Sequence, residues 1–301
     1  MDESERNKWL EERRSGIGGS DAAAVLGLSP WTTPFEVYQS KLGLAPPINE
    51  SWPMRWGNWL EPHLRQSYSD LTGREVLMHP GVIRHPKHEW MLATLDGHTP
   101  DGRLVEIKTS RSADGWGEPG SADIPQHYML QVQHYLAVTA YPVADVVLGL
   151  YGQEPRIYEV PADLELQQLM LEQEEAFWGN VQRSEPPEPI TLADAMARYG
   201  KRSEARSVVA SPDILHMATR LKEVSVLIKT LNTEIDEAKG QIMAALAEAD
   251  TLVDATGTPL VTWKMAKPSQ RFDAGLFKAQ HPDLYKQFTQ PGEASRRFLI
   301  K

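Results

Sequence analysis

The chain has 301 residues, with 31 Lys and Arg against 41 Asp and Glu, 22 Pro and no Cys. The lack of cysteine excludes disulfides, thiolate zinc sites, iron–sulfur clusters and a cysteine nucleophile. No apolar run approaches the roughly 18 residues that a membrane-spanning helix needs, and the amino-terminal segment is charged throughout. We therefore expect a soluble, cytoplasmic protein without a signal peptide or a membrane partner.

Charge and proline divide the chain into two parts. Residues 1–200 carry 16 basic and 29 acidic side chains, whereas residues 201–301 carry 15 and 12. Pro186, Pro187 and Pro189 mark a linker just before this change. We expect a first domain over 1–200 and a C-terminal extension over 201–301. The overall charge of −10 argues only weakly against a nucleic-acid partner, because binding uses a local patch and bound divalent ions would reduce local negative charge.

The first domain is predicted to be of the α/β (α+β) class, with a mixed central sheet flanked by helices. Helices are expected over 3–14, 22–26, 32–42, 54–71, 126–139 and 162–178, and strands over 75–83, 90–95, 104–109, 143–151 and 157–160. Ser20 and Asp21 are interpreted as the N-cap of the second helix.

The C-terminal extension has a different pattern. Ten apolar residues alternate spacings of three and four without a break: Ile214, Met217, Leu221, Val224, Ile228, Leu231, Ile235, Ala238, Ile242 and Ala245. This heptad pattern predicts a long helix over about 211–248 that packs against a partner helix or a core. A β-hairpin is expected next, over 251–253 and 260–264 with its turn at Gly257 and Thr258.

The residues best suited to chemistry lie in Leu-Asp-Gly and Val-Glu-Ile-Lys segments. Alternate side chains of a strand share a face, so Glu106 and Lys108 point the same way and Ile107 points into the core. A glycine turn after Asp96 could bring its carboxylate beside Glu106. Two carboxylates and a backbone carbonyl suit Mg²⁺ or Mn²⁺, and a lysine beside them could assist an attacking water. The alternative is an ordinary surface hairpin.

Helical residues could contribute to the same site. Glu61, on the helix 54–71, is either a salt-bridged boundary residue or a further metal ligand. Gln131 and Tyr135 are spaced i, i+4 on the helix 126–139, so they share a face that either lines this cleft or belongs to the core.

A glycine-rich segment, Arg13-Arg14-Ser15-Gly16-Ile17-Gly18-Gly19-Ser20-Asp21, suggests an anion site. Glycines allow backbone amides to face an anion, and the helix that follows adds its positive end and the Ser20 hydroxyl. Arg13 or Arg14 could then bind a phosphate with two hydrogen bonds. The alternative is a plain glycine turn with a helix cap.

Taken together and in this order, the motifs resemble those of the YqaJ-type viral recombinases, relatives of phage lambda exonuclease in the PD-(D/E)XK nuclease superfamily. The resemblance covers about residues 9–150 and rests on Trp9-x-x-x-Arg13 leading to GIGGSD, SPWTTPFEVYQSKLG (29–43), WGNWLEPHL (56–64), LDG with EIK, and QVQHY (131–135).

The resemblance implies a restriction-endonuclease-like fold and a 5′→3′ exonuclease that digests linear double-stranded DNA and leaves a 3′ tail for recombination by strand annealing. It also implies site residues: Asp96, Glu106 and the Ile107 carbonyl as ligands of two Mg²⁺ or Mn²⁺ ions, Glu61 completing the site, Lys108 assisting the water, Gln131 orienting the lysine, Arg13 and Ser20 holding the 5′-phosphate, Met54 parting the terminal base pairs, and Tyr135 as a candidate substrate contact.

The same resemblance implies a phage or prophage origin, a single-strand annealing protein as partner and a homo-oligomer, with a ring-shaped trimer as the family's arrangement. The extension 201–301 departs from the minimal pattern. It is interpreted as an oligomerisation or DNA-end arm, a docking segment for the annealing protein, or a helical buttress on the nuclease core. The alternative functions are a structure- or site-specific endonuclease of the same superfamily and a non-catalytic DNA-binding or assembly module.

Overall fold

The structure is a computed structural model that describes residues 11–45, 50–201, 203–290, 292 and 294–300. The chain forms two compact units, Met1–Arg198 and Tyr199–Lys301, which are considered separately below. Of the helix expected over 3–14, residues 11–14 are helical and the remainder lies outside the described residues. None of the described helices is long and apolar enough to cross a membrane.

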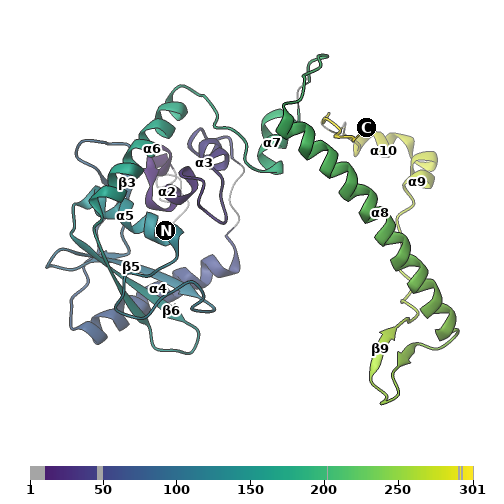
Figure 1. Cartoon of the computed structure of the whole chain (residues 1–301), viewed down its shortest axis with the longest axis horizontal. Coiled ribbons are helices and arrows are strands. Elements are labelled where there is room, and N and C mark those ends of the chain that lie inside the picture. Colours follow the sequence, from purple (N-terminus) through teal and green to yellow (C-terminus); the bar gives the residue numbers. More distant parts are fainter. Residues whose placement is uncertain (1–10, 46–49, 202, 291, 293, 301) are drawn as a thin grey trace. The chain divides into compact units, whose positions relative to one another are not determined.

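A four-stranded mixed sheet forms the centre of the first unit (Figure 1). Its order is β4 (Gly97–His98), β5 (Arg103–Ser110), β6 (Val143–Leu150) and β7 (Arg156–Pro161). β5 and β6 are parallel, and the other two pairings are antiparallel. The parallel pair requires a crossover connection, which includes a helix. The expectation of a mixed central sheet is confirmed.

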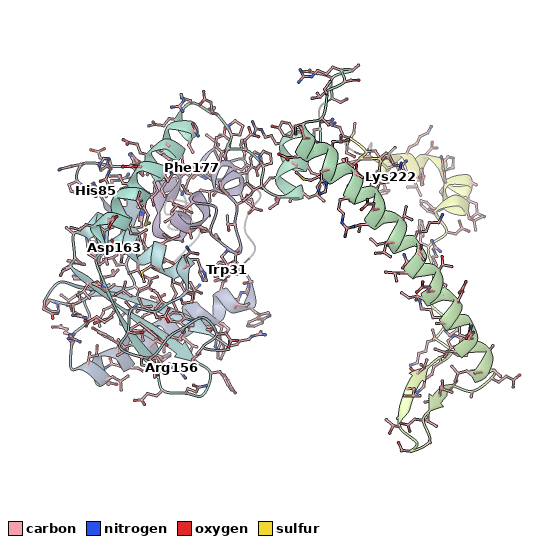
Figure 2. All side chains as sticks on the ribbon, in the orientation of Figure 1. Trp31, His85, Arg156, Asp163, Phe177 and Lys222 are labelled. Carbon is pink, nitrogen blue, oxygen red and sulfur yellow. The ribbon has the colours of Figure 1, made fainter. Side chains whose placement is uncertain are left out.

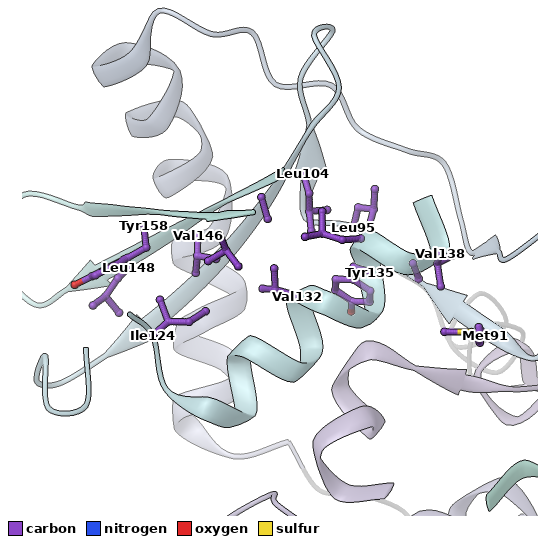
Figure 3. Packing of buried hydrophobic residues seen from close by; sticks show 14 of the residues in the cluster. Met91, Leu95, Leu104, Ile124, Val132, Tyr135, Val138, Val146, Leu148 and Tyr158 are labelled. Atoms are coloured by element: carbon purple, nitrogen blue, oxygen red, sulfur yellow. The ribbon is translucent and has the colours of Figure 1, made fainter. Parts of the chain in front are cut away.

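Two helices cover the two faces of this sheet. α4 (Trp52–Thr72) packs Leu64 and Tyr68 on one face, against Val105, Ile107 and Val147. α5 (Gln126–Thr139) covers the other face (Figure 3). There Val132 and Leu136 of α5 belong to one core cluster with alternate side chains of β5, β6 and β7: Leu104, Val146, Leu148 and Tyr158. α6 (Leu164–Gln182) packs on α5. Successive side chains of β5 therefore lie on opposite faces of the sheet, as strand geometry requires.

A separate three-stranded sheet has the order β1 (Ile17–Gly18), β3 (Met91–Ala93) and β2 (Ile83–Arg84). The strand expected over 75–83 is wrong. Leu77 forms an isolated bridge to His98, and Ile83 begins β2. Pro80, which lacks an amide donor, and Gly81, with a φ of 90°, separate these two short pairings.

Three shorter helices complete the first unit. α2 (Gly19–Val25) and α3 (Pro34–Lys41) pack beside α6, and α7 (Leu192–Tyr199) ends at the boundary of the unit. The N-cap of α2 is Gly18 rather than Ser20 or Asp21, because Asp21 accepts a hydrogen bond from the Gly18 amide at 3.0 Å. This shift leaves the Ser20 hydroxyl in the first helical turn, where it does not cap the helix.

The second unit contains the long helix α8 (Pro212–Leu246), followed by β8 (Thr251–Val253) and β9 (Pro259–Thr262), which pair antiparallel. Two short helices, α9 (Ala274–Gln280) and α10 (Pro282–Gln287), come next. The helix and the hairpin occupy the positions at which the heptad pattern and the Gly257 turn predict them. Gly257 has a φ of 85°, a conformation that favours glycine.

Candidate active site

β5 and α5 together form a closed hydrogen-bonded group of three side chains. Lys108 Nζ donates to Glu106 Oε1 at 2.7 Å and to Gln131 Oε1 at 2.9 Å. Gln131 Nε2 donates to the same Glu106 oxygen at 2.7 Å. Glu106 and Lys108 lie two residues apart on β5 and therefore face α5 together. The structure thus brings together three residues that the sequence proposed for one site.

Burial sets the electrostatics of this group. Glu106 is 2% exposed, and burial, reinforced by the nearby Asp96 charge, raises the pKa of its carboxyl to about 8. Burial alone would lower the pKa of Lys108, but the charges of Glu106 and Asp96 outweigh it, so that pKa is raised. Lys108 also lies over the Tyr128 ring, 4.9 Å from its centroid. The lysine therefore keeps its proton and carries the positive charge of the group.

Asp96 lies where the glycine turn was expected to place it. Gly97 pairs with Val105, so the preceding residue, Asp96, is brought level with Glu106. Asp96 Oδ2 accepts a hydrogen bond from the Ile107 amide at 2.8 Å. Burial raises the pKa of Asp96, and the Lys108 charge opposes this shift. Ile107 itself packs its side chain into the core under α4.

Glu61 approaches the site from α4. Its Oε1 accepts a hydrogen bond from Arg65 Nη2 at 2.6 Å, and Arg65 Nε donates to the main-chain oxygen of Asp96 at 2.9 Å. Burial, together with the Asp96 charge, raises the pKa of Glu61. Sequence reasoning missed Arg65. The available signal was its i, i+4 spacing from Glu61, which places the two side chains on one helix face.

The donor groups of this site suit a hard divalent cation. Glu106 Oε2 is buried and has no hydrogen-bond partner, which is costly unless a further group satisfies it. Carboxylate oxygens are the ligands that Mg²⁺ and Mn²⁺ prefer. Within the described residues, no three His, Asp or Glu side chains are placed so that they could hold one ion by themselves. Glu61 accepts a hydrogen bond from Arg65, and Asp96 accepts one from the Ile107 amide.

The glycine-rich segment brings Arg13 and Ser20 together. Arg13 Nη2 donates to Ser20 Oγ at 2.8 Å and lies 3.7 Å from Asp21 Oδ1. Lys41, which sequence reasoning missed, is 8% exposed and donates to Asp21 Oδ2 at 2.6 Å and to the Arg13 carbonyl at 2.9 Å. Burial would raise the pKa of Asp21, but the charges of Lys41 and Arg13 outweigh it and lower that pKa. This network orients Arg13 toward the Ser20 hydroxyl.

Tyr135 connects the glycine-rich segment to the carboxylate site. A Cβ at Gly19 would lie 2.4 Å from Tyr135 Cε1, so only glycine permits this approach. The Tyr135 hydroxyl accepts a hydrogen bond from Gln131 Nε2 at 3.4 Å. Tyr135 is 6% exposed. Its burial favours a packing role over the substrate contact that the sequence suggested.

Met54 lies in the first turn of α4 and is 50% exposed. Trp52, Trp56 and Trp59 on the same part of the helix are also exposed. Their rings pack edge to face, with centroids 6.0 Å apart for Trp52 and Trp59 and 6.3 Å apart for Trp56 and Trp59. An apolar, aromatic surface therefore extends along α4 from Trp52 to Trp59 and ends two residues before Glu61. Sequence reasoning identified Met54 but missed the tryptophan cluster around it.

Comparisons with solved structures identify the fold of the first unit. The structure resembles crystal structures of an alkaline exonuclease (LHK-Exo) from Laribacter hongkongensis, with 24% identity, and of LHK-Exo in complex with dAMP, with 23% identity. Each match has a TM-score of 0.50 and covers 59% of this chain and 93% of that one. At this identity the likeness shows the fold, and the PD-(D/E)XK-like core expected from the sequence is confirmed.

Two sequence comparisons identify the family. The family model for the YqaJ-like viral recombinase domain matches residues 8–142. The uncharacterized protein YqaJ of Bacillus subtilis (strain 168) is 30% identical over 308 residues, which span 99% of this chain and 95% of the relative. The resemblance inferred from the motifs is thereby confirmed, and the chain belongs to the YqaJ-like viral recombinase family.

Proposed function

We propose that this protein is a metal-dependent 5′→3′ exonuclease that degrades one strand of linear double-stranded DNA and leaves 3′ single-stranded tails for recombination by strand annealing. The observation that carries the proposal is the buried Glu106–Lys108–Gln131 group with Asp96 beside it. The family and the exonuclease-like fold support a nuclease role.

The residues divide the chemistry between them. Asp96, Glu106 and the Ile107 carbonyl would hold Mg²⁺ or Mn²⁺, two ions in the proposed form, with Glu61 completing the set. Bound divalent cations supply a water of lowered pKa and stabilise charge on the scissile phosphate. Lys108, whose ammonium is fixed by two hydrogen bonds, would orient the attacking water and stabilise negative charge on phosphorus.

Gln131 would act as a positioning residue. Its amide bonds both Lys108 and Glu106, so its removal would free the lysine to rotate. A donor that is already held in place does not have to reorient during the reaction. Losing it therefore lowers the rate of the chemical step and has little effect on the affinity for substrate. Gln131→Ala should therefore lower kcat with little change in KM.

End specificity is assigned to the Arg13–Ser20 pair. A guanidinium beside a hydroxyl near the positive end of α2 suits a terminal 5′-phosphate, and the Asp21–Lys41 contacts hold Arg13 in place. Met54, half exposed before Glu61, would part the terminal base pairs. If these assignments hold, wild type prefers 5′-phosphorylated ends and Arg13→Ala loses that preference.

The test is Mg²⁺-dependent degradation of a linear duplex by Asp96→Asn and Glu106→Gln. Both variants should lose activity by about a thousandfold or more, since each removes a charge on which the reacting centre depends. Asp101→Asn is the matched control because Asp101 is exposed and lies in the turn between β4 and β5. Full activity in both active-site variants would refute the nuclease assignment.

Two alternative functions have distinct outcomes. A structure- or site-specific endonuclease would cut covalently closed circular duplex, which an end-requiring exonuclease leaves intact. A non-catalytic DNA-binding module would bind duplex ends without metal-dependent degradation, and the assembled Glu106, Lys108 and Gln131 group disfavours it.

The proposal extends to partners and setting. A single-strand annealing protein is the proposed partner, because it would bind the 3′ tails as they form. The proposed assembly is a homo-oligomer with a ring-shaped trimer as its form, encoded by a phage or prophage and acting in the bacterial cytoplasm. Co-purification with the annealing protein and light scattering of the intact protein test these points.

A further inference from the structure

The heptad positions of α8 form an exposed apolar stripe along the helix. We call the ten residues of the heptad pattern, from Ile214 to Ala245, the α8 seam. Ile214 is 53% exposed, Leu221 43%, Ile228 53% and Ile235 49%, while Val224 and Ile242 are half-buried. Figure 2 shows side chains projecting along the whole helix, with Lys222 marked in its first half.

A helix of this kind is expected to have a partner. α8 has 35 residues and is about 52 Å long at 1.5 Å per residue. Most helical stability in proteins comes from packing of an apolar face, not from helix propensity. A continuous exposed apolar stripe of this length marks an interaction site.

The period of the seam indicates what kind of partner. A straight α-helix drifts by about 20° per heptad relative to a strict seven-residue repeat. Ile214 and Ala245 are 31 residues apart, or about four and a half heptads. The drift over this length would amount to about 90°, so the stripe would wind away from a flat protein surface. The stripe stays in contact along its whole length only if the partner is another helix that supercoils with it.

We propose that α8 forms a parallel coiled coil with α8 of a neighbouring copy of this chain. The inference rests on the proposed homo-oligomer, and the contact between two neighbouring helices is the same whether the coil has two strands or three. Ile214, Leu221, Ile228, Ile235 and Ile242 take the first core position of each heptad, and the second is taken by Met217, Val224, Leu231, Ala238 and Ala245. Isoleucine at the first position is typical of parallel coiled coils. No polar residue interrupts the seam, so the same stripe on a second copy is complementary to it.

The size of the contact is sufficient for a specific interface. A strip about 10 Å wide, one helix diameter, over the length of α8 buries about 500 Å² on each copy. The total of about 1,000 Å² reaches the lower range of specific protein interfaces. Ala238 and Ala245 are small, so the helices can approach closely over the last two heptads.

Charges beside the seam favour the parallel orientation. Glu234 precedes a first core position and Lys239 follows a second one, so they occupy the flanking positions g and e. In a parallel pair, Glu234 of one copy lies beside Lys239 of the other, five residues on, and symmetry repeats the contact. An antiparallel pair with both seams fully overlapped would instead place Glu234 beside Leu227 and Lys239 beside Ala218. Lys239 also lies 3.7 Å from its own Asp236, and both are largely exposed.

The absence of cysteine makes a direct test possible. Ile235→Cys introduces a thiol into the seam, and Thr233→Cys introduces one on the opposite face of α8 as a matched control. Under mild oxidation of the full-length protein, Ile235→Cys should form an intermolecular disulfide at least tenfold faster than Thr233→Cys. Because Ile235 lies away from the centre of the seam, an antiparallel pair would keep the two thiols apart.

A second pair of variants tests the seam itself. Added to Ile235→Cys, Ile228→Glu should abolish the cross-link, whereas Val226→Glu should leave it, since Val226 faces away and is 61% exposed. Both substitutions fall on exposed positions, so the fold should be retained. The proposal is overturned if both cysteine variants cross-link at the same rate, if neither does, or if Ile228→Glu has no effect. None of these readouts depends on nuclease activity.

Discussion

The burial of Glu106 makes a quantitative prediction about stability without metal. Its carboxyl is 2% exposed and its pKa is raised from 4.5 to about 8. The folded state therefore binds this proton more tightly than the unfolded state does. The stabilising contribution of the proton is complete below pH 4.5 and is lost as the pH rises toward 8. Each pH unit in this window corresponds to about 1.4 kcal/mol, so wild type should lose roughly 3 kcal/mol between pH 5 and pH 7.5.

Glu106→Gln removes this titration and keeps the side-chain shape. Unfolding in urea should be followed in EDTA at pH 5 and pH 7.5 for wild type, Glu106→Gln and the exposed control Glu165→Gln. Relative to wild type, the free energy of unfolding of Glu106→Gln should rise by roughly 3 kcal/mol more at pH 7.5 than at pH 5. For a unit of this size the difference corresponds to about 6–12 °C in Tm. The amide left in place of Oε2 affects both pH values alike, so the comparison isolates the charge.

Mg²⁺ extends the same measurement. A cation that binds the folded state alone stabilises it by mass action, so Mg²⁺ should raise the Tm of wild type at pH 7.5 and leave that of Glu106→Gln nearly unchanged. If wild type, Glu106→Gln and Glu165→Gln respond identically to pH, then Glu106 ionises freely in the folded protein. The reasoning from its burial would then be refuted.

Other contacts lead to further predictions. Both ring nitrogens of His134 face acceptors, Glu174 and the Leu92 carbonyl, so Glu174→Gln should cost roughly 3–5 kcal/mol in urea unfolding. Burial would lower the pKa of His134, but the Glu174 charge outweighs burial, so the pKa of His134 is raised. The ion pair therefore contributes fully to the stability of the fold below pH 6.5, and this contribution should decline as the pH rises through the raised pKa. Gly19→Ala should lower stability by about 1–3 kcal/mol through overlap with the Tyr135 ring, and an unchanged Tm would contradict the close approach. Gly240→Ala meets open space within α8, so it should raise helix stability by about 1 kcal/mol, measured by circular dichroism.

The parts of the site that sequence predicted are those that local geometry fixes. Strand alternation put Glu106 and Lys108 on one face. Helical spacing left open whether the Gln131 face lines the cleft, and the family resemblance assigned Gln131 to the lysine. The Asp96 position followed from a short glycine turn, which leaves few possible pairings. Glu106 and Lys108 lie on one strand, so the period of the strand decides their face. Asp96 lies directly before β4, so the short turn between β4 and β5 decides its position.

What sequence missed depends on contacts between distant segments. β3 was expected in the central sheet but pairs with β1 and β2, and its own residues do not specify those partners. Lys41 reaches Asp21 across 20 residues, and its burial in an ion pair has no local signature. The N-cap at Gly18 was missed because Asp21, a good capping residue, bonds back to the chain from inside the helix.

The overall charge of −10 was a poor guide to the partner because the site sets its own local balance. Glu61, Asp96 and Glu106 face two cationic side chains, Arg65 and Lys108, that are fixed by hydrogen bonds. When all five are ionised, these residues leave one negative charge. Burial raises the pKa of each carboxylate, and the Asp96 charge adds to this for Glu61 and Glu106. Added positive charge would oppose these shifts. The acidity of the first unit is therefore compatible with a polyanionic substrate if cations accompany it.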